Sequence, residues 1–262
     1  MAEELSLYAV FGHPIAHSLS PVLHNAAFQS SGLSAFYLPV DCPPAELMER
    51  LAAFRSLGGR GVNLTRPLKE TVIPYLSAKS DWVDESGAAN TLCWTDEGWA
   101  GDNTDCQALF RLIRPAATGE AALVLGSGGA ARASAAVLKR HGYRVVVAAR
   151  RPRNCVWADE TIAWPERISA GETWAVVVNA TPLGQIGEPE EGDWPLPSSN
   201  GVAVEWVYRP RATVFARQAQ GAGRLVVDGL TLLIEQAALA WEVWFDQVGP
   251  RHVMWEAVRS WA

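Results

Sequence analysis

The chain has 262 residues, of which 49% are hydrophobic, and its formal net charge is −6. This length suffices for one large domain or two modest domains with a proper apolar core. An acidic balance argues against a nucleic-acid partner, because neutralising phosphates requires a basic face. Membrane partners are not expected either, since no apolar run reaches spanning length and the start of the chain carries Glu3 and Glu4 rather than positive charge.

The four cysteines show no paired spacing. This usage indicates free thiols in a reducing compartment rather than disulfides. Together with the lack of a signal peptide, it predicts a cytoplasmic protein.

The first segment predicts a strand at residues 5–11 and a helical run at residues 22–31. Between them, Ser20 before Pro21 fits a helix N-cap followed by a proline in the first turn. Ser18 has no such structural explanation. Two hydroxyls beside a helix N-terminus predict a pocket for a small polyol or a carboxylate. The nearby histidines do not predict a metal site, because prolines interrupt the segment and no supporting carboxylate lies near in sequence.

The following segment predicts a strand, a helix and another strand, at residues 36–40, 43–57 and 61–64. The last strand runs into a capped helix start, which places Asn63, Thr65 and Lys69 around one strand end. A lysine in the first turn of a helix interacts unfavourably with the helix dipole, so its position indicates a function. Residues 87–92 then lead into a short strand, and a turn at residues 96–98 is followed by residues 99–105.

Residues 121–153 carry the most informative local pattern, a strand–helix–strand unit with glycines in its first turn. The pieces are an apolar strand at 121–125, the turn Gly126-Ser127-Gly128-Gly129, a helical run at 130–140 and a second apolar strand at 145–149. The glycines let the backbone approach a ligand, and the helix N-terminus offers unpaired N–H groups that suit a pyrophosphate. Ala131 replaces the third glycine of the usual fingerprint. The alternative is a tight turn in some other α/β domain.

Basic residues follow the second strand of this unit. A cofactor with a free ribose 2′-hydroxyl usually meets an acidic residue there, but this chain has Arg150, Arg151 and Arg153. Guanidinium groups match a phosphate with forked hydrogen bonds, so the arginines predict a 2′-phosphate and hence NADP(H). A solvated basic turn is the alternative, and the absence of any acid between residues 145 and 155 weakens it.

The remaining chain continues the α/β pattern. We expect strands at 174–178, 202–207 and 225–227, helices at 213–220, 230–248 and 251–261, and a surface loop at 185–200. No internal repeat is present.

These motifs, in this order along essentially the full chain, resemble shikimate dehydrogenase. The matching segments are residues 17–21, 63–69, 87–91, 103–105, 126–130, 179–184, 207–210 and 229–236. Eight matches in register are hard to explain by chance. Among the departures, Glu205 stands where an Asp is common, and Asp105 is not followed by the glycine often found there.

The resemblance implies an α/β fold of two domains. A substrate domain with a small mixed sheet would comprise residues 1–103 and 237–262, and a doubly wound Rossmann NADP-binding domain would comprise residues 104–236. The implied activity is the reversible NADPH-dependent reduction of 3-dehydroshikimate to shikimate in aromatic amino acid biosynthesis. The protein would act as a monomer or homodimer and without a metal.

The resemblance also implies roles for individual residues. Lys69 and Asp105 match the catalytic pair. The substrate-binding residues would be Ser18, Ser20, Asn63, Thr65, Asn90, Asp105, Tyr208 and Gln236, with the two serines on the substrate carboxylate. The cofactor-binding residues would be Gly126, Ser127, Gly128, Gly129, Ala130, Arg150, Arg151, Asn179, Thr181 and Gly229.

Two other functions remain open. An NAD-dependent quinate/shikimate dehydrogenase would need room for one more hydroxyl and an acid after residue 149, where the arginines lie. A non-catalytic sensor that binds a shikimate-like ligand should have lost Lys69 or Asp105, and both are present.

Overall fold

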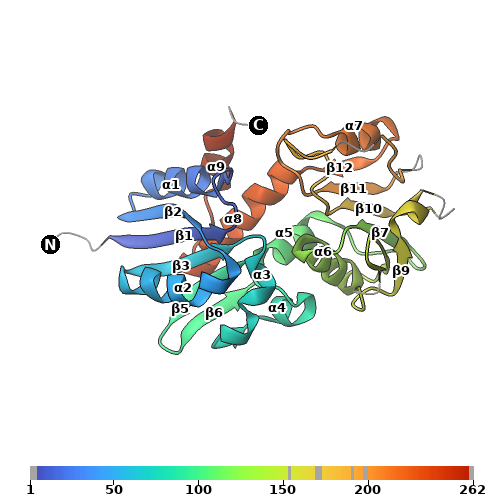
Figure 1. Cartoon of the computed structure of the whole chain (residues 1–262). Coiled ribbons are helices and arrows are strands. Elements are labelled where there is room, and N and C mark those ends of the chain that lie inside the picture. Colours follow the sequence, from blue (N-terminus) through green and yellow to red (C-terminus); the bar gives the residue numbers. More distant parts are fainter. Residues whose placement is uncertain (1–4, 153–154, 169–172, 190–191, 197–199, 260–262) are drawn as a thin grey trace. The chain divides into compact units, whose positions relative to one another are not determined.

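The computed structural model describes residues 5–152, 155–168, 173–189, 192–196 and 200–259, and Figure 1 shows the course of the chain. The chain divides into two compact units. The first unit contains the chain up to Thr104 and from Ile234 onward, and the second contains Asp105–Leu233.

The first unit is built on a six-stranded mixed sheet. Its strands are β1 (Ser6–Gly12), β2 (Ala35–Asp41), β3 (Gly59–Leu64), β4 (Ala78–Lys79), β5 (Thr91–Thr95) and β6 (Gly98–Asp102), in the order β2-β1-β3-β5-β6-β4. Strand β1 pairs in parallel with β2 and β3, whereas β5 runs antiparallel to both β3 and β6. The expected small mixed sheet is therefore confirmed.

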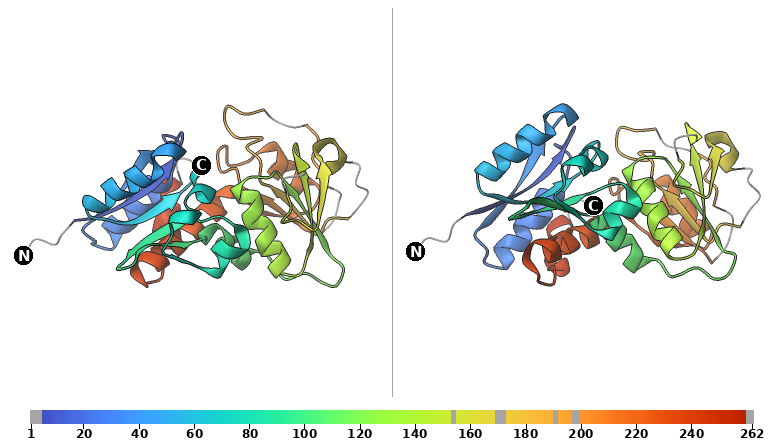
Figure 2. Two further views of the ribbon diagram at one scale, coloured as in Figure 1. Left: turned by 60° about the horizontal axis from the view of Figure 1, so that its bottom comes forward. Right: turned by 90° about the horizontal axis from the view of Figure 1, so that it is seen from below.

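Helices cover both faces of this sheet (Figure 2). They are α1 (Ser20–Ser30), α2 (Leu47–Ser56), α3 (Leu68–Thr71), α4 (Asp81–Ser86), α8 (Gly229–Phe245) and α9 (Arg251–Val258). On β1, Ala9 and Phe11 enter a core shared with α2, while the alternate residue Tyr8 packs on Phe28 of α1 and Trp244 of α8. The aromatic side chains of α8 thus serve as core packing.

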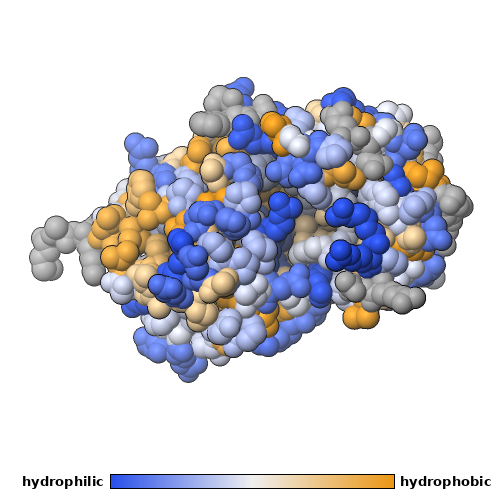
Figure 3. Space-filling model, in the orientation of Figure 1, coloured by the Kyte–Doolittle hydropathy of each residue, from blue (hydrophilic) through white to orange (hydrophobic). Residues whose placement is uncertain are grey.

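The two ends of the first sheet differ in polarity. The apolar side chains of Leu5, Phe36 and Leu57 are exposed near the amino ends of β1, β2 and β3, and Figure 3 shows apolar surface on this unit. The candidate polar residues lie toward the opposite, carboxyl ends of β1 and β3. The candidate polar residues and the exposed apolar side chains therefore lie at opposite edges of the sheet.

The second unit is a doubly wound parallel sheet, as expected. Its strands are β7 (Ala121–Leu125), β8 (Arg144–Ala149), β9 (Glu160–Ala163), β10 (Val176–Asn179), β11 (Val202–Glu205) and β12 (Leu225–Val227), in the order β12-β11-β10-β7-β8-β9. Its helices are α5 (Thr104–Leu112), α6 (Gly129–Arg140) and α7 (Val214–Gly221). All neighbouring strands are parallel, and the order reverses between β7 and β10, which makes a topological switch point there.

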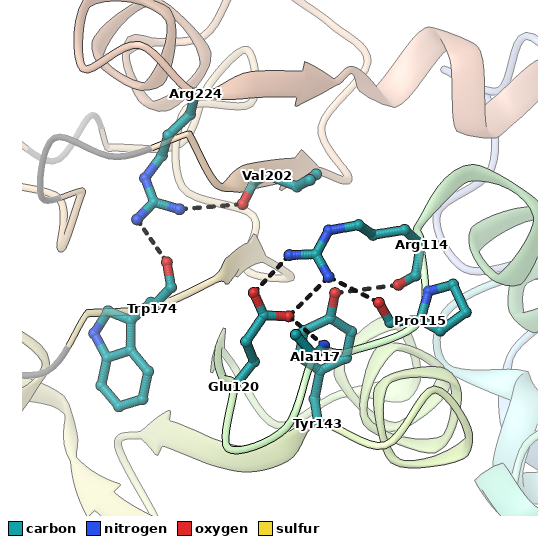
Figure 4. A network of polar contacts seen from close by, with 8 residues as sticks. All are labelled: Arg114, Pro115, Ala117, Glu120, Tyr143, Trp174, Val202 and Arg224. Carbon is teal, nitrogen blue, oxygen red and sulfur yellow. Dashed lines mark hydrogen bonds and ion pairs between the residues drawn. The ribbon is translucent and has the colours of Figure 1, made fainter.

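Arginines tie the amino ends of these strands together (Figure 4). The guanidinium of Arg224, just before β12, donates to the carbonyls of Val202 at 3.3 Å and Trp174 at 2.7 Å. Arg114 forms a two-pronged ion pair with Glu120, the residue before β7, at 2.8 and 2.6 Å. These contacts stabilise the strand order at the edge opposite the glycine turn.

Several boundaries differ from the sequence-based predictions. The helix expected at residues 43–57 is a short 3-10 turn at Pro44–Glu46 followed by α2, and the strand expected at 174–178 is Val176–Asn179. The elements β4, α4 and β9 were not predicted, because such short segments show no clear periodicity. Parts of the expected loop at 185–200 and the end of the last predicted helix lie outside the described residues.

All four cysteines are free thiols. Within the described part of the chain, no helix combines the length and apolarity required to cross a membrane.

Candidate functional site

Ser18 and Ser20 lie in the connection between β1 and α1. The Ser18 hydroxyl accepts a hydrogen bond from the Ser20 backbone N–H at 3.3 Å. Helix α1 includes Ser20, and the preceding residue Leu19 makes no side-chain cap. The N-cap expected at Ser20 is therefore wrong, and Ser18 has the local structural role that the sequence did not suggest. The two serines are neighbours at one helix start.

Asn63, on β3, has all of its amide atoms engaged. Its Nδ2 donates to the carbonyl of Asn90 at 3.2 Å and to the hydroxyl of Thr91 at 3.0 Å. Its Oδ1 accepts the phenol proton of Tyr37 at 2.7 Å. The structure thus brings the Asn63 side chain against the Asn90 backbone.

Asn90 precedes β5 and presents its amide in a fixed orientation. Its Oδ1 accepts hydrogen bonds from the backbone N–H of Thr104 at 2.7 Å, the Thr104 hydroxyl at 3.1 Å and the Thr91 hydroxyl at 3.0 Å. Its Nδ2 donates to none of the residues that the structure describes. This amide nitrogen can therefore donate to a ligand hydroxyl.

Thr65 and Lys69 follow the carboxyl end of β3. The Thr65 methyl packs so closely on Gly12 that a β-carbon there would collide with it, so the glycine permits this approach. The expected capped helix start is wrong: α3 begins at Leu68, after Pro67, and has no side-chain cap. Lys69 lies in this four-residue helix, half-buried, and its carbonyl accepts the Ala89 N–H at 2.9 Å.

The remaining residues predicted to contact substrate are divided between the units. Gln236 lies on the part of α8 that belongs to the first unit. Asp105, in the first turn of α5, and Tyr208, in the loop after β11, belong to the second.

The glycine turn of the second unit lies at the switch point between β7 and β10. Gly126 has φ +115°, and a β-carbon on it would lie 2.8 Å from the carbonyl oxygen of Ala180, in the loop after β10. Gly128 has open space around it, with nothing within 4 Å of a β-carbon. Helix α6 begins directly afterwards, at Gly129, with Ala130 in its first turn. Ser127 is exposed.

This geometry fits a dinucleotide. Ligands of doubly wound sheets bind outside the carboxyl ends of the strands at the switch point, and the open side of Gly128 leaves the backbone accessible there. Ala131 is fully buried, so a small residue allows close packing of α6 on the sheet. Arg150 and Arg151 directly follow β8, are exposed, and could hold a 2′-phosphate. Arg153 lies outside the described residues.

A buried carboxylate orders the loop after β10. Asn179 Oδ1 accepts from the backbone N–H of Thr181 at 3.2 Å and from its hydroxyl at 2.7 Å, while Nδ2 donates to Glu205. Glu205 also accepts from the Thr213 hydroxyl at 2.6 Å and the Val207 N–H at 2.9 Å. Burial raises the pKa of Glu205 to about 7, and these hydrogen bonds oppose the rise. Asn179 therefore stabilises the loop through its hydrogen bonds to Thr181.

Gly229 begins α8 against the loop that carries Tyr208. A β-carbon on Gly229 would collide with the carbonyl group of Val207, so the glycine lets the helix start approach that loop.

No cluster of three metal-ligating side chains is present among the described residues. The histidines near the first helix have separate roles. His13 pairs with Asp41 at 3.0 Å, and His24 is fully buried.

Sequence reasoning missed four residues that form hydrogen bonds with the predicted site residues, namely Tyr37, Thr91, Thr104 and Glu205. Tyr37 occupies an ordinary strand position, so no local pattern marks it, whereas Thr91 ends the matched segment 87–91. Thr104 lies inside a matched motif. Glu205 was noticed only as a departure from the common Asp.

Two family models match the chain. The model for the shikimate dehydrogenase substrate binding domain matches residues 10–92, and the model for the shikimate 5'-dehydrogenase C-terminal domain matches residues 229–259. A shikimate dehydrogenase (NADP(+)) from Thermosynechococcus vestitus is 34% identical over 276 aligned residues, which cover 98% of this chain and 96% of that protein.

Solved structures show similarity to the same family. The chain is similar to shikimate 5-dehydrogenase from Thermus thermophilus in complex with shikimate, with a TM-score of 0.84, 35% identity and 98% coverage of both chains. It is also similar to the complex of that protein with NADP(H) and shikimate, with a TM-score of 0.83, 34% identity, and coverage of 98% of this chain and 99% of the other.

Proposed function

The chain belongs to the shikimate dehydrogenase family, and from this premise we propose that it reduces 3-dehydroshikimate reversibly to shikimate, with Lys69 and Asp105 as its catalytic pair. It is an NADP-dependent oxidoreductase of the shikimate pathway. The observation that carries the proposal is the similarity to dehydrogenases of this family over nearly the whole chain.

Substrate binding is assigned to the polar edge of the first unit. Ser18 and Ser20 would donate to the carboxylate, because both lie at the start of α1, where the Ser18 hydroxyl accepts the Ser20 N–H. Asn90 would donate from its Nδ2, the amide atom that its protein contacts leave available. The remaining contacts to the ring hydroxyls would come from Asn63, Thr65, Tyr208 and Gln236.

Lys69 and Asp105 would handle the proton. When the carbonyl of 3-dehydroshikimate becomes an alkoxide, an ammonium group can stabilise the charge and supply the proton, and a carboxylate can orient that group. The Lys69 carbonyl accepts from Ala89, the next residue Asn90 accepts from Thr104, and Asp105 follows Thr104 in the chain. The pairing of Lys69 with Asp105 rests on the match of both residues to the catalytic motifs of the family.

The cofactor would be held by the second unit. When bound, the nicotinamide cofactor supplies the hydride. The turn of Gly126 to Ala130 would approach its pyrophosphate, and Arg150 and Arg151 its 2′-phosphate. Asn179, Thr181 and Gly229 would shape the adjoining loops.

We assign residues 1–103 and 237–262 to the substrate domain and residues 104–236 to the NADP domain. We further propose a cytoplasmic monomer or homodimer. Sedimentation would distinguish the two oligomeric states, and cell fractionation would identify the compartment.

The test of the activity is to follow reduced nicotinamide by its absorbance, with shikimate and quinate each combined with NADP⁺ and NAD⁺. We expect the highest kcat/KM for shikimate with NADP⁺. A preference for quinate and NAD⁺ would replace this assignment by the quinate/shikimate dehydrogenase. Shikimate binding by calorimetry without turnover would indicate a sensor and refute the catalytic proposal.

A further inference from the structure

The indole of Trp206 forms a hydrogen bond between two elements of the second unit. Trp206 directly follows β11, and its Nε1–H donates to the Ser134 hydroxyl of α6 at 3.0 Å. The two residues are 72 positions apart in the sequence. Ser134 is fully buried, so the bond satisfies a hydroxyl that has no contact with solvent.

The protons in this contact have one consistent arrangement. An indole nitrogen only donates, so the Ser134 hydroxyl accepts the proton of Trp206. The same hydroxyl donates its own proton to the carbonyl of Ala130 at 2.8 Å, because a carbonyl only accepts. A continuous chain of hydrogen bonds therefore leads from Trp206 to the first turn of α6.

The backbone of Trp206 is bonded to the neighbouring strand β10. Its N–H donates to the carbonyl of Asn179, the last residue of β10, at 3.1 Å. Strand β10 lies between β11 and β7 in the sheet, and α6 packs on β7 and β8. To reach α6, Trp206 therefore passes the carboxyl end of β10, which is one side of the switch point where the dinucleotide is proposed to bind.

The residue before Trp206 contacts a different helix. The Glu205 carboxylate accepts a hydrogen bond from the Thr213 hydroxyl, and Thr213 caps α7. Successive residues at the end of β11 thus bond to α7 and to α6, as the alternation of side chains along a strand allows. A change at Trp206 can therefore affect α6 without removing a side chain from the Glu205 network.

The start of α6 lacks a side-chain cap of its own. Gly128 occupies the N-cap position without a side-chain hydrogen bond, and no acidic residue lies in the first turn. An uncapped start leaves backbone N–H groups for a pyrophosphate. Because no cap fixes this start, its position depends on contacts from other elements, and the bond from Trp206 through Ser134 to Ala130 supplies one.

We propose that Trp206 is a positioning residue for the cofactor: through Ser134, its indole fixes the start of α6, where the pyrophosphate would bind. This inference rests on the cofactor site proposed above. A helix start that is fixed before binding does not have to be ordered in the complex. Trp206 therefore raises the affinity for the dinucleotide without contacting it.

The test is Trp206→Phe, which keeps an aromatic ring but removes the indole N–H. We expect the Kd of NADP⁺, measured by calorimetry without shikimate, to rise about threefold to tenfold, the factor that corresponds to one neutral hydrogen bond. Hydrogen exchange of the backbone amides at the start of α6 should be faster in the variant without cofactor. The KM for shikimate and the kcat, both with saturating NADP⁺, should change by less than about twofold. An unchanged Kd would overturn the inference.

Trp194→Phe is the matched control. Trp194 belongs to the core of the same unit and packs on Phe215 of α7, and its indole nitrogen has no hydrogen-bond partner among the described residues. The same substitution there removes no such bond, so it should leave the Kd of NADP⁺ unaltered. An equal rise in Kd in both variants would identify general packing damage and would also overturn the inference.

Ser134→Ala removes the acceptor of the indole proton and leaves Trp206 in place. If Trp206 acts through Ser134, the double variant Trp206→Phe/Ser134→Ala should have the Kd of Ser134→Ala alone. Multiplication of the two single effects would show that Trp206 acts by another route and would refute the positioning role. An unmodified chain that binds NADP⁺ but does not oxidise shikimate would instead overturn the proposed function and leave this inference standing.

Discussion

Asn179 and Glu205 are joined by a buried, bifurcated hydrogen bond: Nδ2 of the amide lies 2.9 Å from one carboxylate oxygen and 3.1 Å from the other. Because the Thr213 hydroxyl and the Val207 N–H donate to the same carboxylate, Glu205 connects the ends of β10 and β11 to the start of α7. This connection orders the loop in which Asn179 holds Thr181. The loop proposed to shape the cofactor site therefore depends on a buried titrating group.

The first prediction concerns the pH dependence of stability. Burial raises the Glu205 pKa from 4.5 to about 7, so the folded chain binds this proton more tightly than the unfolded chain. The resulting contribution to the free energy of unfolding is fully present below pH 4.5 and is lost as the pH rises through about 7. The shift corresponds to roughly 3 kcal/mol. In Glu205→Gln, we expect this pH-dependent fall in the free energy of unfolding to be absent.

The measurement is urea unfolding of both proteins at several pH values. His24 contributes with the opposite sign, because burial lowers its pKa from 6.5 to about 3, so its contribution is present above pH 6.5 and lost toward pH 3. Taking the difference between Glu205→Gln and the unmodified chain cancels the His24 effect. Equal pH slopes in the two proteins would contradict the prediction.

The second prediction compares two glycines of one turn. Gly126→Ala should lower the free energy of unfolding by about 2 kcal/mol, because φ is +115° and the new β-carbon would meet the Ala180 carbonyl. Gly128→Ala should leave stability unchanged, since nothing lies within 4 Å of its β-carbon. It should nevertheless raise KM for NADP⁺ about tenfold if the backbone there approaches the pyrophosphate. Chemical unfolding and initial rates separate the two effects, and normal NADP⁺ affinity in Gly128→Ala would exclude that approach.

The parallel sheet could be predicted from the sequence because its strands are continuous apolar runs. Residues 121–125 and 145–149 have no polar interruption, and the glycines between them mark the turn. The boundaries of α1 and α3 were less accurate. Ser20 and Thr65 have the composition of helix caps, but the Ser18 hydroxyl accepts the Ser20 N–H at the start of α1, and α3 begins at Leu68 without a side-chain cap.

The candidate site was predictable only where the chemistry lies in a local motif. Asn63, Asn90 and Lys69 belong to short matched segments. Tyr37 contacts Asn63 across 26 positions, and Glu205 contacts Asn179 across the same separation. Such partners come together only through strand pairing in the folded chain, so spacing in one sequence does not reveal them.

The third prediction concerns the choice between NADP⁺ and NAD⁺. Replacing Arg150 and Arg151 together by Ala should raise KM for NADP⁺ by at least about tenfold to a hundredfold, because the loss of even one charge-assisted hydrogen bond costs about 1.5–3 kcal/mol. KM for NAD⁺ should change little. Arg144→Ala is the matched control, since Arg144 lies at the other end of β8 and pairs with Glu160 at 3.0 Å. An equal rise in KM for both dinucleotides would show that the arginines do not bind the 2′-phosphate.

The fourth prediction tests the proton step. Lys69→Ala should lower kcat for shikimate oxidation by about 10²–10⁴, the usual contribution of a positioned acid or base, while KM for shikimate changes less. The reason is that the ammonium group is needed where charge develops, and the hydroxyl and amide donors of Ser20 and Asn90 remain to bind the substrate. Lys79→Ala is the control, because Lys79 is a surface lysine of the same unit, paired with Asp84 at 2.9 Å. Steady-state rates with saturating NADP⁺ give the comparison, and a Lys69→Ala enzyme with unchanged turnover would remove Lys69 from the proton step.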